Sequence, residues 1–432
     1  MRRPIFSSIL FICSLGWCGQ PAPAQSGSAA GPQPKDVRIV AKDGQAAIPK
    51  LALYLNSPSL ATRIEVVKQL TDLGGKDSID PLITATRDSD PEMQLRATDG
   101  LVNFYLPGYV RQGPAASVSR VGAAIKAKLS DTNDQVIDGF VVVRPDVILA
   151  IGKLASGGNG MDVKAGACRA IGILRGQAAI PDLVEALHTK DNTVMYEALV
   201  AIRKIADPAA GPRITYLLRD LDDRIQSLAI ETAGLLQARD GLPTLRSIVA
   251  NPRGSKAERS ALAAIALMPE PSDRVLFQRY LGSKDERVRA AAVEGLGRIG
   301  DPGDHATIDK VWKDDEKMPP RLASAFALTL AGNVDLAEAS PFRYLLNELN
   351  SAAWRETASA YLIEAARHPP VLAALYQPLE TGTRDERIQI ARILAASGDA
   401  GTVPELDKLS RDSDNNVAQE GLKALRTLRA RL

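Results

Sequence analysis

The sequence is poor in the residues that build metal and redox centres. Its 432 residues include only 3 cysteines and 3 histidines. The histidines, His188, His305 and His368, lie far apart, and none has a second ligand at the spacing of a zinc site. The Walker, nucleophile-elbow and His-Glu-x-x-His motifs are absent as well. We therefore predict no metal or cofactor site, and we expect that the chain is not an enzyme.

The sequence also has almost no excess of one charge. Its 53 lysines and arginines are balanced by 51 aspartates and glutamates, which leaves a formal net charge of +2. Proteins that bind nucleic acids usually carry a basic excess or a basic stripe, because they neutralise phosphates. Nucleic acid is therefore not an expected partner.

Long apolar runs are missing beyond the first residues. Arg2 and Arg3 precede the run from Ile5 to Trp17, and small residues and prolines lead to Ala24. A membrane span needs about 20 apolar residues, more than this run contains. A basic, an apolar and a small-residue region in this order are typical of a secretory signal peptide. We expect cleavage after Ala24 and no transmembrane segment in the remaining chain.

The predicted signal peptide, or leader, determines the expected organisation of the N-terminus. Residues 1–24 are predicted to be a signal peptide, and residues 25–44, which begin with a Ser-, Gly-, Ala-, Pro- and Gln-rich stretch, a flexible tether. The protein is then exported, to the periplasm or outside the cell. Lipidation of Cys18 is the alternative fate of the leader. Cleavage would leave Cys168 as the only cysteine, so no intrachain disulfide is expected.

One amphipathic helix pattern recurs throughout the chain. An aspartate is followed, three residues later, by a series of apolar or small residues at i, i+4, i+7, i+8 and i+11, which form one face of an α-helix. The i+4 and i+7 residues are always small, which lets another backbone approach closely. The aspartates are expected to cap the helix N-termini. The pattern begins at Asp90, Asp191, Asp222, Asp285 and Asp414.

A shorter helix with proline in its first turn precedes each copy of this pattern. Pro181, Pro212 and Pro243 recur at equal spacings of about 31 residues, enough for two helices and two tight turns. The expected fold class is therefore all-α, a right-handed α-solenoid of stacked two-helix units. It should span residues 45–432 with about eleven units. An irregular insertion interrupts it near residues 104–143.

One repeat carries a recognisable family pattern. The stretch from Asp285 to Pro302, Asp-Glu-Arg-Val-Arg-Ala-Ala-Ala-Val-Glu-Gly-Leu-Gly-Arg-Ile-Gly-Asp-Pro, resembles the short HEAT-like repeats of bacteria that are named after phycobilisome lyases. This resemblance implies the solenoid fold. It also implies an enzymatic alternative, because such repeats occur in lyases that attach bilin chromophores, and related repeats occur in alkylated-DNA glycosylases. Both kinds of enzyme work inside cells, so the expected export argues against them.

Three glycines of this repeat also fit the dinucleotide fingerprint G-x-G-x-x-G. Gly295, Gly297 and Gly300 lie at the end of a predicted helix. The fingerprint binds a pyrophosphate only between a strand and the start of a helix. We therefore expect these glycines to serve helix packing and not a cofactor.

The inserted segment contains candidate contact residues. Tyr105, Tyr109 and Arg111 lie where the repeat does not need aromatic residues, and Tyr and Arg are enriched where interfaces concentrate their binding energy. We therefore predict that they contact a partner. The alternative, that these side chains plug a gap beneath the insertion, is equally open.

The repeated helices supply a second set of candidates. Stacked two-helix units create a long groove lined by one helix of each pair. The i+1 positions of the repeated helices are expected to be exposed in this groove, and their mixed character argues against a ligand of a single charge. The predicted contact residues among them are Met195, Gln226 and Arg289.

The expected function follows from this groove. We expect a non-enzymatic scaffold that binds a protein or peptide along the concave face of the solenoid. The alternatives are a lyase-type HEAT-like repeat enzyme that attaches a bilin and a passive structural spacer of the cell envelope.

Overall fold

The computed structural model describes residues 31–110 and 135–432, and the chain there forms pairs of helices, each a short first helix and a longer second helix. The first helices are α2 (Ile48–Tyr54), α4 (Ile79–Ala85), α7 (Pro145–Gly157), α9 (Ile180–Ala186), α11 (Gly211–Ile214), α13 (Leu242–Ala250), α15 (Arg274–Tyr280), α17 (His305–Asp314), α19 (Pro341–Glu348), α21 (Pro369–Ala374) with α22 (Tyr376–Thr381), and α24 (Val403–Leu409). The second helices are α3 (Leu60–Leu73), α5 (Pro91–Tyr105), α8 (Met161–Ile173), α10 (Asn192–Ile205), α12 (Asp223–Leu235), α14 (Ser255–Leu267), α16 (Glu286–Ile299), α18 (Met318–Leu330), α20 (Arg355–Ala365), α23 (Arg384–Ser397) and α25 (Asn415–Arg431).

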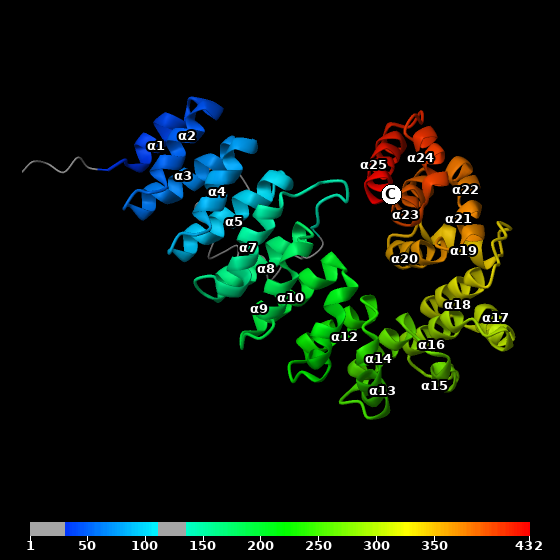
Figure 1. The fold of residues 1–432 in the computed structure, drawn as a ribbon. Helices are drawn as coiled ribbons and strands as arrows, with labels where there is room; N and C mark the ends of the chain where they lie inside the picture. Colours follow the sequence, from blue (N-terminus) through cyan, green and yellow to red (C-terminus); the bar gives the residue numbers. More distant parts are fainter. Residues whose placement is uncertain (1–30, 111–134) are drawn as a thin grey trace, which may run out of the picture.

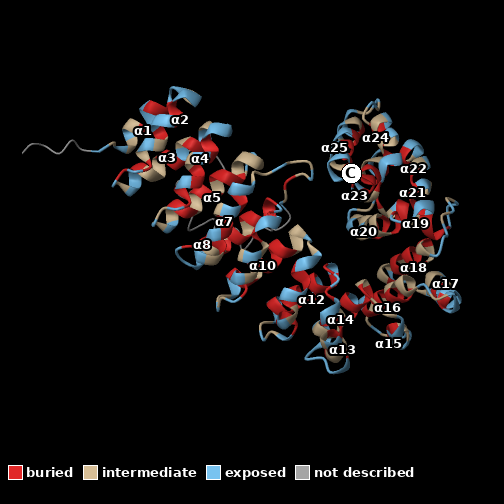
Figure 2. Ribbon diagram, viewed as in Figure 1, coloured by how far each residue is buried: buried red, intermediate tan, exposed pale blue. Residues whose placement is uncertain are grey.

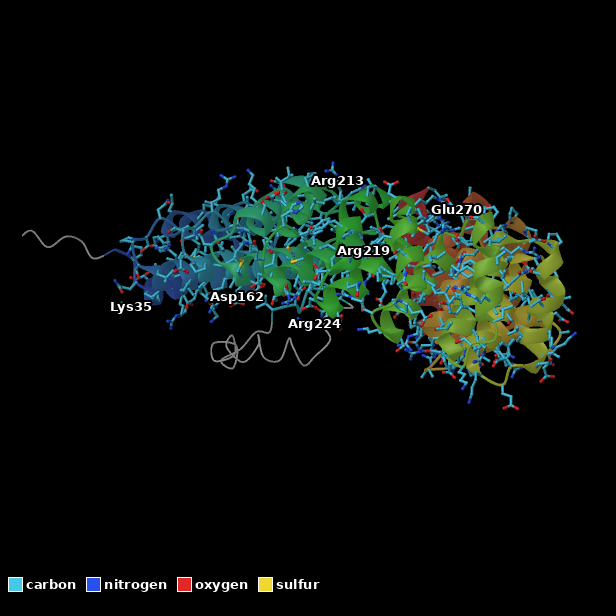
Figure 3. The ribbon with its side chains drawn as sticks, turned by 90° about the horizontal axis from the view of Figure 1, so that it is seen from below. Lys35, Asp162, Arg213, Arg219, Arg224 and Glu270 are labelled. Carbon is cyan, nitrogen blue, oxygen red and sulfur yellow. The ribbon has the colours of Figure 1, made fainter. Side chains whose placement is uncertain are left out.

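The pairs stack side by side into a curved solenoid (Figure 1). From α14 to α25 the second helices lie on the inner side of the arc and the first helices on the outer side, and the part after α18 curls back toward the N-terminal half. Figure 3 shows Asp162 and Arg224, near the starts of α8 and α12, on one long edge, and Arg213, in α11, on the opposite edge. First and second helices therefore run in opposite directions. The all-α solenoid expected from the sequence is confirmed.

The N-terminal end differs from the expectation. Residues 34–41, assigned to a flexible tether, form α1 (Pro34–Ala41), and its Val37 and Val40 are buried in the core. An end helix of this kind shields the apolar face of the first unit from water. The predicted signal peptide, Arg111 and residues 112–134 of the insertion lie outside the described residues.

The aspartates that open the repeated helices cap them as predicted. Asp285 accepts from the backbone N–H groups of Arg287 and Val288 at 2.9 and 3.4 Å. Asp90, Asp191, Asp222 and Asp414 make the corresponding pairs of hydrogen bonds. Each cap satisfies donors that the first turn of a helix leaves unpaired.

The three glycines of the dinucleotide-like motif pack and end a helix. A Cβ at Gly295 would lie 2.3 Å from the ring of Phe277 in α15, and one at Gly297 would lie 2.5 Å from Cβ of Ala327 in α18. Gly300 ends α16 with φ of 70°, in the left-handed region that favours glycine. The packing position of Gly295 and the place of Gly300 in the C-terminal turn, both expected from the sequence, are confirmed.

Two hydrophobic cores meet in α18. Ala323 and Ala327 belong to the core that extends back to α1, whereas Leu322 and Phe326 belong to the core that extends to α25. Figure 2 shows the buried residues following the stack between these ends. α18 is therefore the joint between the two parts of the arc. Within residues 31–110 and 135–432, no helix has the length and apolar character needed to span a bilayer.

We expect the core of α16 to contribute more stability than its cap. Leu296 is fully buried, so Leu296→Ala should lower the free energy of unfolding by about 2–5 kcal/mol. Asp285→Ala should lower it by about 1 kcal/mol, because one cap is lost. Urea unfolding followed by far-UV circular dichroism measures both, and equal losses would show that Leu296 is not a core residue.

Candidate functional site

Contacts between next-but-one units identify the inner surface of the arc. Tyr361 of α20 donates to Oε1 of Glu294 in α16 at 2.6 Å. Arg298 of α16 donates to both carboxylate oxygens of Glu364 in α20 at 2.8 and 2.9 Å. The helix between them in the chain, α18, belongs to the unit in between. Second helices of next-but-one units meet in this way on the inner side of a curved stack, so these residues mark that side.

The same register places other side chains on the inner surface. Glu294 has equivalents, at the same distance from the N-cap, in Glu231 of α12, Arg392 of α23 and Lys423 of α25. All three equivalents are about half exposed, at 52%, 54% and 48%. Leu235, one helical turn after Glu231, is exposed as well. We call Glu231, Leu235, Arg392 and Lys423 the inner row.

Neighbouring helices neutralise the charges of the inner row. Glu231 pairs with Arg203 of α10 at 3.9 Å, and Arg392 pairs with Glu420 of α25 at 2.9 Å. The hydrogen bond to Glu420 raises the pKa of Arg392, which stays cationic. Exposed ion pairs contribute only about 0–1 kcal/mol each. A bound molecule can therefore replace Arg203 at little cost, whereas Glu420 is only 14% exposed and is held more firmly.

A buried cluster holds the units around α18 together. Tyr361 stacks on Phe326 with ring centroids 4.5 Å apart, and the Arg298 guanidinium lies 5.0 Å from the centroid of the same ring. Burial acts to lower the pKa of Arg298, but the contacts with Glu364 and Glu294 raise it overall. Burial, and then Glu294, raises the pKa of Tyr361, whose hydroxyl stays protonated and donates. The cluster therefore links α16, α18 and α20 in one arrangement.

A segment that precedes α7 crosses from the N-terminal half to the C-terminal helix. Ile137 N–H donates to the carbonyl of Ile173 at the end of α8 at 3.0 Å. Asp138 pairs with Lys423 of the inner row at 2.6 Å. Figure 1 shows this loop reaching toward α25. We call residues 135–143 the clasp.

Apolar contacts fix both sides of the clasp. A Cβ at Gly139 would lie 3.2 Å from Cγ2 of Thr427 in α25. Val141 and Val143 pack against the core of the N-terminal half, whereas Val142 is exposed. The clasp is therefore anchored on one part of the arc and touches the other.

The predicted residues of the insertion lie beside the start of α7. The Tyr105 hydroxyl accepts from the backbone N–H of Arg144 at 3.2 Å, and its ring makes an edge contact with Phe104. Tyr105 and Tyr109 both pack, partly buried, against the core of the N-terminal half. This packing favours the alternative in which they plug a gap. Arg111 lies outside the described residues, and a role of these residues in partner binding stays a prediction.

Met195, Gln226 and Arg289 do not line the inner surface as exposed side chains. Met195 is 8% and Gln226 5% exposed, so the expected exposure of these two is wrong. Gln226 donates to the carbonyl of Leu218 and accepts from Arg253. The i+1 position faces the end of the first helix and the adjoining unit, which explains the burial. Contact of these three residues with a partner stays a prediction.

Arginines at the i+1 position of the second helices link successive units. Arg289 donates to both carboxylate oxygens of Asp315 at 2.8 and 3.0 Å, and also to the carbonyl of Ser283. Arg63 makes the same two-pronged contact with Asp88 at 2.7 and 3.1 Å. Such fork-shaped contacts add geometric specificity to charge attraction. They fix the spacing between neighbouring units.

Sequence reasoning missed the acidic partners of these arginines. Arg387 in α23 donates to one carboxylate oxygen of Asp412 from the same helical position. The acids follow their arginines by 25 or 26 residues, and this spacing is a signal that the sequence offered. We call Arg63–Asp88, Arg289–Asp315 and Arg387–Asp412 the arginine ladder.

The described residues offer little classical reaction chemistry. Burial raises the pKa of Cys168 to about 12, which keeps the thiol protonated. In the described ranges, no group of three or more His, Cys, Asp or Glu side chains is arranged to hold a metal ion. Two open hollows of about 410 and 580 Å³ adjoin Arg343 and Asp80, away from the inner row.

Comparison with known proteins finds a repeat family in part of the chain. A family model described as HEAT repeats matches residues 148–234. Phycocyanobilin lyase subunit alpha of Nostoc sp. (strain PCC 7120) is 26% identical over 154 residues, which are 33% of this chain and 56% of that protein. The match thus spans about half the length of this curated relative.

Two solved structures show a loose similarity to the chain. The complex of CpcE and CpcF of phycocyanin lyase from Nostoc sp. PCC7120 is 18% identical, covers 74% of this chain and 96% of that chain, and has a TM-score of 0.31. Importin beta is 14% identical, covers 92% of this chain and 60% of that chain, and has a TM-score of 0.38. Residues 148–234 of the solenoid thus match HEAT repeats, and part of the chain resembles a phycocyanobilin lyase subunit.

One expectation from the sequence requires correction. The expectation that the chain is not an enzyme is contradicted by the sequence similarity to a lyase subunit. It rested on missing catalytic motifs and on an expected export.

We expect the clasp to bring Gly139 and Thr427 within disulfide distance. Gly139→Cys with Thr427→Cys, with Cys13 and Cys18 replaced by serine, should crosslink within the monomer under mild oxidation. The rate of crosslinking is followed by the changed mobility of the crosslinked monomer on a non-reducing gel. Val142→Cys with Thr427→Cys is the control and should react more slowly, because Val142 is exposed. Equal rates would show that the clasp does not adopt this contact.

Proposed function

We propose that the chain binds a segment of another protein along the inner row, between α12 and α25. The observation that carries this proposal is that charged side chains of both signs and an apolar residue are exposed together on the inner surface. Such a surface suits a polar segment with an apolar anchor, which Leu235 would receive. Curved solenoids of stacked units offer extended concave surfaces of this kind.

The clasp influences how a partner reaches this surface. Asp138 already forms an ion pair with Lys423, and both side chains of this pair are partly exposed. Exposed pairs of this strength exchange readily with other charged groups. A bound segment would therefore compete with the clasp for Lys423. We propose the periplasm or the cell exterior as the place of binding, which is supported by the signal-peptide pattern of residues 1–24.

Site-specific photo-crosslinking tests the inner row. A benzoylphenylalanine at Leu235 should form an adduct with the partner, whereas one at Val275 of α15 should not, because Val275 is exposed on a first helix. Adding Arg392→Glu and Lys423→Glu should abolish the Leu235 adduct. Adducts formed at Val275 and not at Leu235 would contradict the proposal.

A second candidate function is that of a lyase subunit that acts on a bilin. The sequence similarity to phycocyanobilin lyase subunit alpha favours it. Bilins carry two propionate carboxylates, and an exposed guanidinium such as that of Arg392 suits a carboxylate. Under this proposal the inner row holds the chromophore as well as protein.

Bilin binding tests the second candidate. When phycocyanobilin is added to the purified chain, the bound bilin should show circular dichroism in the visible range. The signal should saturate as the bilin concentration rises. Arg392→Gln should weaken binding by about tenfold, as expected for a lost hydrogen bond to a charged group. Arg224→Gln is the matched control, because Arg224 is exposed at the edge of the solenoid (Figure 3). Spectra identical to those with urea-unfolded chain would contradict bilin binding.

A further inference from the structure

One arginine of α18 has the ladder position but no ladder partner. Arg321 lies as far after the N-cap of α18 as Arg289 lies after that of α16. Its Nε is buried and has no hydrogen-bond partner in the described part of the chain. No described carboxylate pairs with its guanidinium, although Arg289 holds both oxygens of Asp315.

The sequence explains the missing partner. The acid of the ladder follows Arg289 by 26 residues. The corresponding residue after Arg321 is Asn347, whose Oδ1 accepts from Nε of Arg343 at 2.8 Å. A neutral amide presents one oxygen instead of two and is already engaged. The ladder is therefore interrupted at the joint between the two cores.

Aromatic side chains hold Arg321 in place without using its donors. Its guanidinium carbon lies 5.3 Å from the ring centroid of Trp312 in α17 and 5.1 Å from that of Tyr344 in α19. The two rings meet edge to face with centroids 4.9 Å apart. Rings attract the face of a guanidinium and leave its in-plane N–H groups for oxygen acceptors. Arg321, Trp312 and Tyr344 are all partly exposed, so an external group can reach them.

We propose that Arg321, framed by Trp312 and Tyr344, binds a carboxylate of an acidic segment in a partner protein. A guanidinium without a carboxylate partner gains a charge-assisted, two-pronged contact when a carboxylate binds it, and such contacts are about twice as strong as neutral hydrogen bonds. Carboxylate is favoured over phosphate because Asp88, Asp315 and Asp412 fill this position in the three ladder contacts. The inference goes beyond the proposed function, because Trp312 and Tyr344 belong to the first helices α17 and α19, which lie on the outer side of the arc (Figure 1).

Trp312 provides a built-in reporter for this site. The chain has three tryptophans, so Trp17→Phe and Trp354→Phe leave Trp312 as the only one. The probe is a blocked peptide of alternating Ala and Asp, and its matched control has Asn in place of Asp. The acidic peptide should change the Trp312 emission saturably, and the Asn peptide should not. Arg321→Met should weaken binding at least tenfold, whereas Arg367→Met, an exposed arginine after α20, should leave it unchanged.

The stability of the variants separates binding from folding. Arg321→Met removes no hydrogen bond to a described residue, so the melting temperature should stay within a few degrees of the wild type. Arg289→Met breaks a contact of the arginine ladder and should clearly lower the melting temperature. A peptide affinity unchanged in Arg321→Met would overturn the site, and so would equal binding of the Asn peptide. Binding of a phosphoserine peptide in place of the Asp peptide would overturn the carboxylate assignment.

The peptide experiment is independent of the inner row. An acidic peptide that binds Arg321 while Leu235 forms no adduct would leave the carboxylate site standing and remove the proposed groove. The reverse result would leave the groove standing without this contact.

Discussion

Close contact between successive second helices is the constraint on which the solenoid depends. No two-helix unit buries its apolar face alone, so each relies on small residues that let the neighbouring helix approach. Gly297 against Ala327 of the next second helix, and Gly295 against Phe277 of its own first helix, show how little space remains. Any side chain at these two positions would displace a ring or a backbone. The arginine ladder then adds charge contacts that fix the spacing between units.

Curvature turns this repeated contact into a particular surface. The cluster of Arg298, Tyr361 and Phe326 joins units that a straight stack would keep apart. The C-terminal helix consequently lies within reach of the clasp, and Lys423 pairs with Asp138. Charges that come from distant repeats thus face one interior. Which charges face the interior therefore depends on the shape of the arc more than on any single repeat.

The functional proposals draw on different parts of this architecture. The ion pairs of Glu231 and Lys423 in the inner row are exposed on both sides, which suits exchange with an incoming segment. Arg321 differs, because its aromatic frame positions a guanidinium whose donors have no carboxylate. Similarity to a lyase subunit covers a third of the chain, and it makes an enzymatic role a real alternative to protein binding. Both roles would use the inner surface.

The amino-acid sequence alone determined the helical units, their aspartate caps, the small contact positions and the packing role of the motif glycines, because these depend on residues a few positions apart. It misplaced Met195 and Gln226, since a helical register does not reveal which neighbouring unit covers a given position. The helix at residues 34–41 also escaped prediction. Only the tertiary structure decided which side chains share the interior. The Arg298–Glu364 contact and the contact of the clasp with α25 depend on curvature accumulated over several units, which no local pattern encodes.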